Sequence, residues 1–299
     1  MRQYAGMQVA LGTMHAKERA IAPPFMRMLG AKIVLPSRID TDSFGTFTGE
    51  VERKGTMLEA ARAKARLAMD VTGLPFGVAS EGSYGPHTHL PFLSGGIELL
   101  LFIDDERGIE ISHAQPAART NYDVVAVKPG EDVTSALSRM KFPAHAVTLR
   151  ANQTTERDHG ERGALATVNG LFPEPPLFKG LTSVNSVIDA IRICAASSSD
   201  GKALLVPDMR AHHNPTRMRV IRAAATRLVR RIASECPECG LPGFGILDVE
   251  RGLPCSDCGA PTSLVTAEIH RCTGCSFESR KPLREGQFAR PGQCEHCNP

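Results

Sequence analysis

Four Cys-x-x-Cys turns are the feature of this sequence whose spacing most clearly predicts chemistry. They contain eight of the nine cysteines, with 15, 13 and 18 residues between successive turns. The turns are Cys236 and Cys239, Cys255 and Cys258, Cys272 and Cys275, and Cys294 and Cys297. Two thiolates in such a turn bind one tetrahedral Zn²⁺, and a second turn completes the four ligands. We therefore predict about two structural zinc ions, each closed by four cysteines.

The sequence leaves the pairing of the four turns open. Sequential pairing joins the first turn with the second and the third with the fourth, which gives two zinc ribbons. Cross-brace pairing joins the first with the third and the second with the fourth. A disulfide framework is the alternative chemistry, but the N-terminal residues do not read as a secretion signal. His270 and His296 lie near the cysteines, and we expect neither to replace a thiolate.

The formal charge of the 299-residue chain is +3, but it is unevenly distributed. Residues 233–299 contain six Lys or Arg and nine Asp or Glu, a net of −3, which leaves +6 for the remainder. Each four-thiolate zinc site adds a formal −2, so we expect about −7 for the zinc-loaded module. Because a nucleic acid needs a surface that neutralises phosphates, we expect this module to support structure or to contact a protein, and nucleic acid to be an unlikely ligand.

A lone acid, Glu81, follows the short apolar run "FGVAS", which is typical of a β-strand. A carboxylate at the carboxyl end of a strand suits Mg²⁺, which proteins usually bind through one or two carboxylates and the phosphates of a substrate. Glu50 and Glu52, in the preceding loop, are the candidates for a second carboxylate. We therefore predict a magnesium site at Glu81.

Cationic side chains lie in three segments that an α/β sheet would bring near Glu81. Such sheets bind their ligands beyond the carboxyl ends of the strands, and a helix N-terminus flanked by arginines attracts anions. We predict Glu81, Lys17 and His15 to be the catalytic residues. The predicted contacts to a phosphorylated ligand are Lys64, Arg210, His212, Asn214 and Arg217. Asn214 is also the expected cap of a helix whose first residue is Pro215.

Hydrophobic periodicity predicts alternating strands and helices, and thus an α/β fold with a largely parallel or mixed sheet. Strands are expected at 7–13, 31–36, 76–80, 97–103, 108–112, 122–127, 145–150 and 201–208. Helices are expected at 17–29, 56–72, 131–140, 182–197 and 215–232. Thr56 and Glu59 form a capping box. We assign residues 1–232 to the α/β part and 233–299 to the zinc module.

Arg219, Arg227 and Arg230 lie opposite the apolar stripe of the last helix and are expected to form a solvated face. No apolar stretch approaches the roughly 18 residues of a membrane span, so we predict a cytoplasmic protein without a membrane partner. A homo-oligomer is compatible with the sequence.

Over nearly its whole length the chain resembles an uncharacterised bacterial family, a domain of unknown function. The segments that carry this resemblance are "GTFTGE", "ASEGSYGPH", "DMRAHHNPTRM" and "GLPCSDCG". The resemblance implies no activity.

The stretch Gly55 to Gly82 also resembles the inosine triphosphate pyrophosphatase superfamily. Thr56, Glu59, Ala61, Lys64, Ala65 and "TGLP" at 72–75 keep the register of a helix and turn of that superfamily. "LGTMHAKE" is similar to its first strand and Thr-x-Asn-x-x-Lys phosphate loop, and "NPTRM" falls where it has a Ser-His-Arg turn. The resemblance implies a metal-dependent nucleotide pyrophosphatase fold, with a cleft between two lobes. His15 stands where that superfamily has Asn, and Glu81 stands where it has two acids.

Three hypotheses follow. The first is an α/β protein of the inosine triphosphate pyrophosphatase type followed by a double zinc ribbon. It would bind a phosphorylated, nucleotide-like ligand and hydrolyse a phosphoanhydride with a metal-activated water. The second is a non-enzymatic zinc-ribbon scaffold that binds a protein. The third is a hydrolase of another class that uses histidine-rich loops, such as the one with His87 and His89.

Overall fold

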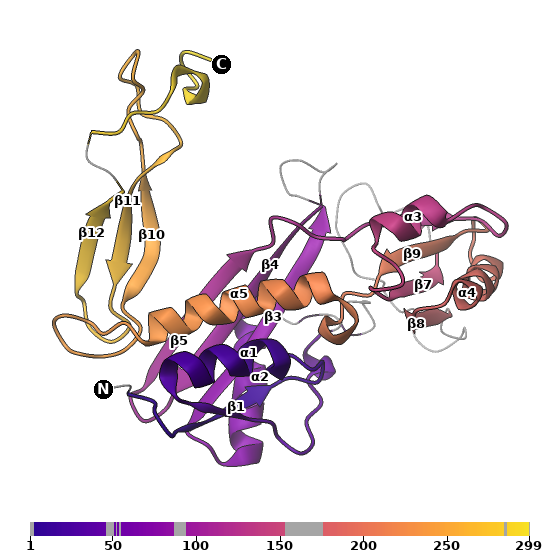
Figure 1. Cartoon of the computed structure of the whole chain (residues 1–299), viewed down its shortest axis with the longest axis horizontal. Helices are drawn as coiled ribbons and strands as arrows, with labels where there is room; N and C mark the ends of the chain where they lie inside the picture. The colour runs from indigo at the N-terminus through magenta and orange to yellow at the C-terminus, as the bar shows by residue number, and fades with distance from the viewer. Residues whose placement is uncertain are drawn as a thin grey trace.

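The computed structural model describes residues 3–45, 51, 53, 55–86, 94–152, 176–283 and 286–298. These residues form three separate sheets, of five, four and three strands. Figure 1 shows the five-stranded sheet in the middle of the molecule, the four-stranded sheet at one end, and the three-stranded sheet projecting from the other end.

The five-stranded sheet has the order β2-β1-β3-β4-β5. Its first three strands pair in parallel, whereas β3, β4 and β5 pair antiparallel. The predicted mixed α/β class is therefore confirmed. The strands are β1 (Gln8–Gly12), β2 (Lys32–Val34), β3 (Phe76–Pro86), β4 (Ser94–Asp104) and β5 (Ile109–Pro116).

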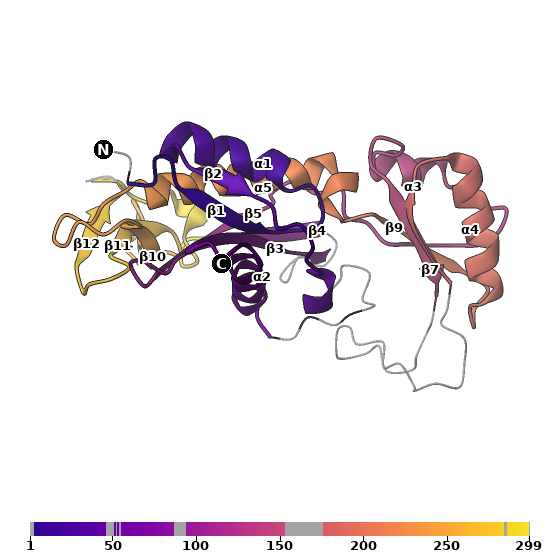
Figure 2. The same ribbon diagram turned by 90° about the horizontal axis from the view of Figure 1, so that it is seen from below.

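Helices cover both faces of this sheet, as Figure 2 shows. On one face lie α1 (Glu18–Pro24), the π-helix η1 (Phe25–Leu29) and the long α5 (Pro215–Ile232), which share a core with the sheet. On the other face α2 (Met57–Thr72) packs an alanine-rich stripe against β1, β3 and β4. The charged side chains discussed below are carried by strands and helices on both faces of this layered body.

Helix α2 approaches the sheet closely, and its N-terminus is capped as predicted. The hydroxyl oxygen of Thr56 accepts a hydrogen bond from the Glu59 N–H at 3.2 Å, and the Glu59 carboxylate accepts one from the Thr56 N–H at 2.7 Å. A β-carbon on Gly12 would collide with the main-chain carbonyl of Lys64. Because Gly12 has no side chain, α2 can pack directly on the end of β1, which places Lys64 over the sheet.

Several elements differ from the sequence prediction: the strand Leu177–Leu181 was not expected, Ile109–Pro116 is longer than expected, and two further differences lie near Glu81 and Lys17. The strand expected at 76–80 runs on to Pro86, because β4 pairs with it along its whole length, from Phe76 opposite Asp104 to Pro86 opposite Ser94. The helix expected at 17–29 changes from α to π geometry after Pro24. Proline provides no N–H for the α-helical bond, which favours such a switch.

The four-stranded sheet has the order β6-β9-β7-β8 and its own hydrophobic core, closed by α3 and α4. Its chain leads from β9 through a short 3₁₀ turn, η3 (Ala211–His213), directly into α5. The segment 208–214 therefore joins the two sheets. The elements are β6 (Val125–Val127), β7 (Val147–Ala151), β8 (Leu177–Leu181), β9 (Ala203–Pro207), α3 (Thr134–Arg139) and α4 (Val184–Ala196).

The C-terminal residues form a narrow arm beyond the end of α5 (Figure 1). Its antiparallel strands are β10 (Gly245–Arg251), β11 (Val265–Arg271) and β12 (Glu278–Pro282), followed by the 3₁₀ turn η4 (Pro291–Gln293). A further 3₁₀ turn, η2, spans Asp42–Phe44 in the first part of the chain. None of the helices in the described part of the chain has the length and apolar character that crossing a bilayer requires.

Candidate functional site

The eight cysteines of the arm gather into two clusters of four. One contains Cys236, Cys239, Cys272 and Cys275, and the other contains Cys255, Cys258, Cys294 and Cys297. Within each cluster the sulfur atoms lie within 4.8 Å of one another. The first turn therefore pairs with the third and the second with the fourth, which is the cross-brace alternative. Either cluster could hold a metal ion.

The sulfur separations fit a tetrahedral metal site and not a disulfide. In the first cluster the sulfur atoms of Cys236 and Cys275 are 3.8 Å apart, and those of Cys239 and Cys272 are 3.5 Å apart. In the second cluster the corresponding distances are 3.9 and 3.7 Å. A tetrahedral site with Zn–S bonds of about 2.3 Å has sulfur atoms about 3.8 Å apart, whereas a disulfide needs about 2.05 Å.

The extended strands determine this pairing. Strand β10 lies between the first and second turns and runs for seven residues, Gly245–Arg251. At about 3.3 Å per residue it carries the chain roughly 23 Å away from the first turn. Strand β11 then returns antiparallel and brings the third turn back to the first. Each cluster therefore lies at one end of the three-stranded sheet.

The first cluster is seated on the body of the molecule. Arg231, in the last turn of α5, donates hydrogen bonds to the carbonyl oxygens of Gly243 in the arm and Ser112 on β5, both at 3.0 Å. Thr273 donates to the Pro242 carbonyl at 2.8 Å, between the two turns that form the cluster. His270 contacts the carboxylate of Glu268 at 3.0 Å and belongs to neither cluster.

A second set of functional candidates surrounds Glu81, a buried side chain on β3. One of its carboxylate oxygens lies 2.6 Å from the Nζ of Lys64 on α2, and the other lies 2.9 Å from an Nη of Arg53. Lys17, at the start of α1, donates from Nζ to the Ser80 carbonyl at 3.0 Å. Two cations from separate segments thus contact one carboxylate, and a third, Lys17, binds the adjacent main-chain carbonyl. We call this set, with Glu98, Asp208, Arg210, Arg217, His15 and His212, the charge cluster.

The predicted position of Glu81 at the end of a strand needs correction. Glu81 lies in the middle of β3, because that strand continues to Pro86. On the opposite edge, however, β1 pairs with β3 only as far as Gly12 opposite Ala79. Glu81 therefore lies just beyond the carboxyl end of β1, next to the segment that carries Lys17.

Burial and neighbouring charges both shift the pKa values of these groups. Burial alone would raise the pKa of Glu81, but Lys17, Lys64 and Arg53 together hold that pKa below its usual value. Burial, followed by the repulsion of Arg217, lowers the pKa of Lys17 to about 8. The pKa of His15 falls to about 3, because the ring is partly buried and lies near Lys17 and His212. At neutral pH the cluster therefore holds an ionised Glu81, a mainly cationic Lys17 and a neutral His15.

Arg217 is the most buried cation in the cluster and is held from two sides. Its Nε lies 2.5 Å from the Oε1 of Glu98 on β4, and one Nη donates to the Met209 carbonyl at 2.6 Å. Its exposed fraction is 1%, and that of Glu98 is 0%. The guanidinium also lies over the ring of Tyr84, 5.7 Å from its centre. Arg217 thus positions the surrounding groups by its charge and contacts.

The remaining predicted ligand contacts separate into two kinds. Asn214 is buried, its Oδ1 caps α5 by accepting from the Arg217 N–H at 2.9 Å, and its amide donates to Asn121 at 3.0 Å. Its observed role is to hold the turn. His212 is exposed and stacks on His15 with ring centres 5.1 Å apart. Arg210 is half-buried and pairs with Asp208 at 2.6 Å.

Some predicted ligands cannot be placed. Glu50, Glu52, His87 and His89 lie outside the described residues. Among the described residues, the groups of three or more His, Cys, Asp or Glu with metal-ligand spacing are the two cysteine clusters. Both oxygens of Glu81 already contact cations, so the described residues around it do not form a magnesium site by themselves. Magnesium at Glu81 stays a prediction.

Three residues of the cluster, Glu98, Arg53 and Asp208, were not selected from the sequence. Glu98 lies in the apolar stretch "IELLLFI", where a single acid in an otherwise hydrophobic strand indicates a buried partner. Arg53 lies in a stretch of sequence rich in polar residues, and nothing in its spacing identifies it. The contacts of Glu98 and Arg53 depend on chain segments far apart in the sequence.

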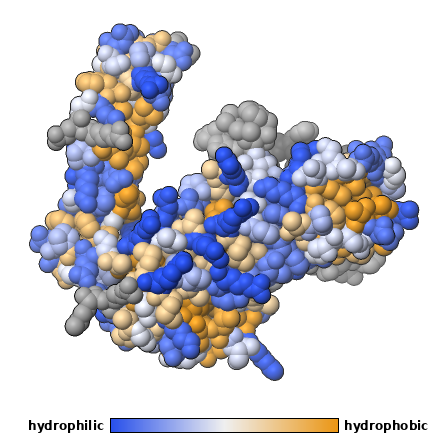
Figure 3. Space-filling model, in the orientation of Figure 1, coloured by the Kyte–Doolittle hydropathy of each residue, from blue (hydrophilic) through white to orange (hydrophobic). Residues whose placement is uncertain are grey.

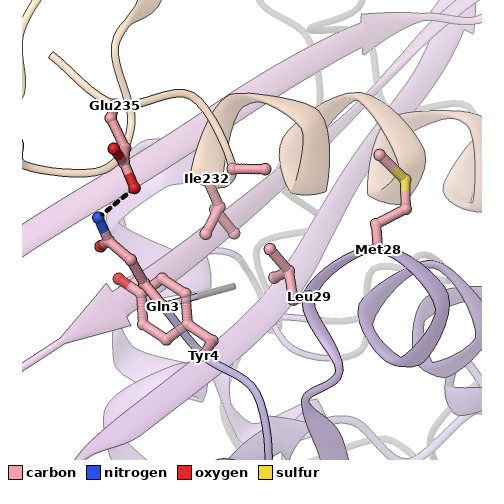
Figure 4. Close-up of a pocket in the computed structure, with 7 residues that line it drawn as sticks. Gln3, Tyr4, Met28, Leu29, Ile232 and Glu235 are labelled. Carbon is pink, nitrogen blue, oxygen red and sulfur yellow. Dashed lines mark hydrogen bonds between the residues drawn. The ribbon is translucent and has the colours of Figure 1, made fainter. Parts of the chain in front are cut away.

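A pocket outside the charge cluster lies between the N-terminal segment, η1 and the end of α5 (Figure 4). It has a volume of about 100 Å³ and is lined by Gln3, Tyr4, Met28, Leu29, Ile232, Ala233 and Glu235. Gln3 donates to Glu235 across it at 2.7 Å. Pockets for drug-sized ligands measure about 300–1,000 Å³, so this one is too small for a nucleotide.

Comparison with known proteins gives one finding about the family. Residues 64–166 and 174–299 match the model of a family described as Domain of unknown function (DUF6671). The match covers both Lys64 and Glu81 of the charge cluster and all eight cysteines of the arm. The predicted resemblance to an uncharacterised family with C-terminal cysteine pairs is thereby confirmed. No curated protein matches the chain.

Proposed function

This chain belongs to the family Domain of unknown function (DUF6671), and we propose from the charge cluster that it binds a phosphorylated, nucleotide-like ligand there. The observation that carries the proposal is the convergence of two buried lysines, Lys17 and Lys64, beside Glu81. A buried lysine is costly unless it meets a carboxylate or an anionic ligand. Two lysines beside one carboxylate carry one more positive than negative charge, which a second anion would neutralise.

The charge balance of the cluster supports an anionic ligand. Among the described residues its cations are Lys17, Arg53, Lys64, Arg210 and Arg217, and its acids are Glu81, Glu98 and Asp208. This is an excess of two positive charges in a partly water-excluded site. Phosphate oxygens accept charge-assisted hydrogen bonds from ammonium and guanidinium groups, which are about twice as strong as neutral ones.

The role of each side chain follows from its position. Lys17 and Lys64 would contact phosphate oxygens, and Arg210 with His212 would contact another part of the ligand near the exposed rim. Arg217 would attract the anionic ligand by its charge without donating a hydrogen bond to it, since its donors are engaged by Glu98 and Met209. His15 is neutral and would offer a hydrogen bond instead of a charge. Glu81 would orient the two lysines and, once the ligand has engaged them, the attacking water.

We also propose that the α/β part belongs to the inosine triphosphate pyrophosphatase type of fold. The support is that the stretch resembling that superfamily forms the capped helix α2, the turn at 72–75 and strand β3, and brings Lys64 to Glu81. Magnesium, which that resemblance implies, would need ligands beyond Glu81. Ligand binding is therefore measured both with magnesium and without it.

For the arm, we propose zinc as the metal in both clusters. Four thiolates with tetrahedral spacing are typical of structural zinc, which has no open coordination position. The proposed role is structural, because a narrow three-stranded sheet has little hydrophobic core of its own. Among its described residues the buried side chains include Cys236, Cys255, Ala267 and Cys294.

The binding proposal is tested with a panel of nucleoside mono-, di- and triphosphates, with magnesium or with EDTA. We expect at least one compound to raise the melting temperature of the wild type. Lys64→Gln should weaken that ligand at least about tenfold, because it removes a charge-assisted hydrogen bond worth about 1.5–3 kcal/mol. Glu81→Gln should retain binding and lose any hydrolysis of the ligand.

The matched control is Arg66→Gln on the same helix, whose exposed guanidinium pairs with Asp105 outside the cluster. It should bind like the wild type. The proposal fails if no phosphorylated compound stabilises the wild type under either condition, or if Lys64→Gln and Arg66→Gln bind equally well while both are folded by circular dichroism.

The binding should also depend on pH through Lys17. Because burial lowers its pKa to about 8, Lys17 is cationic below that pH and neutral above it. Affinity for a triphosphate should therefore be highest below about pH 8 and fall by about tenfold as the pH rises through this value. Isothermal titration calorimetry of wild type and Lys17→Gln between neutral and alkaline pH measures the difference. An equally steep fall in Lys17→Gln would assign the titration to another group.

A further inference from the structure

Helix α5 presents an unusual row of arginines to solvent. From Pro215 to Ile232 the helix contains six arginines and no acidic residue. Arg219, Arg222, Arg227 and Arg230 are exposed, and at 100° per residue they share one side of the helix. From Arg219 to Arg230 they extend over about 17 Å. Figure 3 shows hydrophilic side chains crowded over this face of the molecule.

The neighbouring elements extend the row. Helix α1 packs beside α5, and Arg222 donates from Nη2 to the Arg19 carbonyl at 3.0 Å. Arg19 is exposed on α1, and Arg27 is exposed on η1, which also contacts α5. We call these residues the arginine ridge: Arg19, Arg27, Arg219, Arg222, Arg227 and Arg230.

The ridge lacks internal charge compensation. Among the ion pairs of the described residues, none involves a ridge arginine. The hydrogen bonds of Arg219 and Arg222 go to neutral acceptors, the Thr216 hydroxyl and the Arg19 carbonyl. Like charges three and four residues apart destabilise a helix by a few tenths of a kcal/mol per pair. A bound polyanion would remove this repulsion.

We propose that the arginine ridge binds the phosphate backbone of double-stranded nucleic acid without regard to its sequence. A duplex carries about one negative charge per 1.7 Å of its axis, so a row of about 17 Å faces several phosphates. A guanidinium group can donate two parallel hydrogen bonds to two oxygens of one phosphate. Nucleic acid is expected to be an unlikely ligand because of the acidic charge of residues 233–299, but the ridge belongs to the part of the chain with a net charge of +6.

Two observations favour a duplex over other polyanions. Single-stranded nucleic acid is usually held by aromatic side chains that stack on bases, but the exposed large hydrophobic residues of the described chain include one aromatic, Phe288, on the arm. A membrane-bound helix has bulky apolar residues beside its basic ones. The exposed side of α5 instead alternates arginine with Ala223 and Thr226.

The test is fluorescence anisotropy of a short labelled DNA duplex of mixed sequence, titrated with the full zinc-loaded chain between about 50 and 200 mM salt. We expect a dissociation constant of about 10⁻⁶ to 10⁻⁴ M that weakens steeply with salt. The ridge variant is Arg219→Gln with Arg222→Gln, Arg227→Gln and Arg230→Gln. It should bind more than about tenfold more weakly, and its slope of log affinity against log salt should be smaller by about three to four.

A charge-matched control carries four substitutions of partly or fully exposed helical arginines elsewhere, namely Arg62→Gln, Arg66→Gln, Arg139→Gln and Arg192→Gln. It should keep the wild-type slope, with only a small uniform loss of affinity. Equal losses in both variants would mean that net charge alone attracts the duplex, and would overturn the proposal. So would binding of the wild type to vesicles of anionic phospholipid but not to the duplex. The ridge lies apart from Glu81 and Lys64, so this outcome is independent of the nucleotide assay.

Discussion

Replacing the first and third cysteine turns together should leave the chain with about one zinc ion, whereas replacing the first and second should leave about none. The first variant is Cys236→Ser, Cys239→Ser, Cys272→Ser and Cys275→Ser, which removes one complete cluster. The second variant is Cys236→Ser, Cys239→Ser, Cys255→Ser and Cys258→Ser. It keeps Cys272 and Cys275, so that each cluster retains two thiolates. Two thiolates do not close a tetrahedral site.

Both variants lose four cysteines, so a difference in their zinc content reports the pairing of the turns alone. Sequential pairing would give the opposite result, with no zinc in the first variant and one in the second. Zinc per chain is measured by mass spectrometry of the metal after gel filtration with a weak chelator. Cys194→Ala is the control, since Cys194 is buried in the core of the four-stranded sheet and belongs to neither cluster, and it should retain both ions.

The effect on the arm should be large. Apparent binding free energies of structural zinc in small peptides are about 10–16 kcal/mol, which exceeds the stability of most small folds. We therefore expect the second variant to lose the three-stranded sheet of the arm. Hydrogen exchange should show rapid exchange in β10, β11 and β12 while β3 and β4 stay protected. If β10, β11 and β12 stay as protected as β3 and β4 in the second variant, the arm folds without metal.

Replacing Arg217 with methionine should destabilise the protein by about 3–5 kcal/mol, the largest expected effect of any single change in the charge cluster. Arg217 and Glu98 are both buried and pair at 2.5 Å. Methionine fills part of the space of the guanidinium stem but leaves the Glu98 carboxylate without its partner in a site closed to water. The cost is the desolvation of that carboxylate, and it should appear in urea unfolding monitored by circular dichroism.

Two further variants distinguish this cause from lost packing. Arg217→Met combined with Glu98→Leu removes both charges and should recover most of the loss, since buried ion pairs can often be replaced by apolar residues. Arg66→Met breaks an exposed pair with Asp105 and should cost less than about 1 kcal/mol. If the double variant is as unstable as Arg217→Met alone, the loss comes from packing and the interpretation is wrong.

Sequence reasoning was most successful where the cause is local. The capping box at Thr56 and Glu59 and the Asn214 cap before Pro215 depend on residues three positions apart, and both are found. The alternation of strands and helices predicted the mixed α/β class for the same reason. It was less successful where an element depends on a distant partner. Strand β3 is longer than expected because β4 pairs with all of it.

The charge cluster was predicted in part. Lys17, Lys64 and Glu81 were selected by residue type and position, and the structure places all three together. Glu98 and Arg53 were not found, because each meets a partner on another element and such meetings leave no spacing in the sequence. Asn214 was selected as a ligand contact, but its buried contacts are those of a cap that holds the turn.

The sequence by itself determined that the eight cysteines form four Cys-x-x-Cys turns that could make up two closed metal sites, because the Cys-x-x-Cys turn is a local geometry that any fold must accommodate. It could not determine which turns share an ion, because both pairings use the same residues and the same number of ligands. The tertiary structure decided this through β10. An extended strand holds its two ends apart, and the antiparallel return of β11 then brings the third turn, not the second, beside the first.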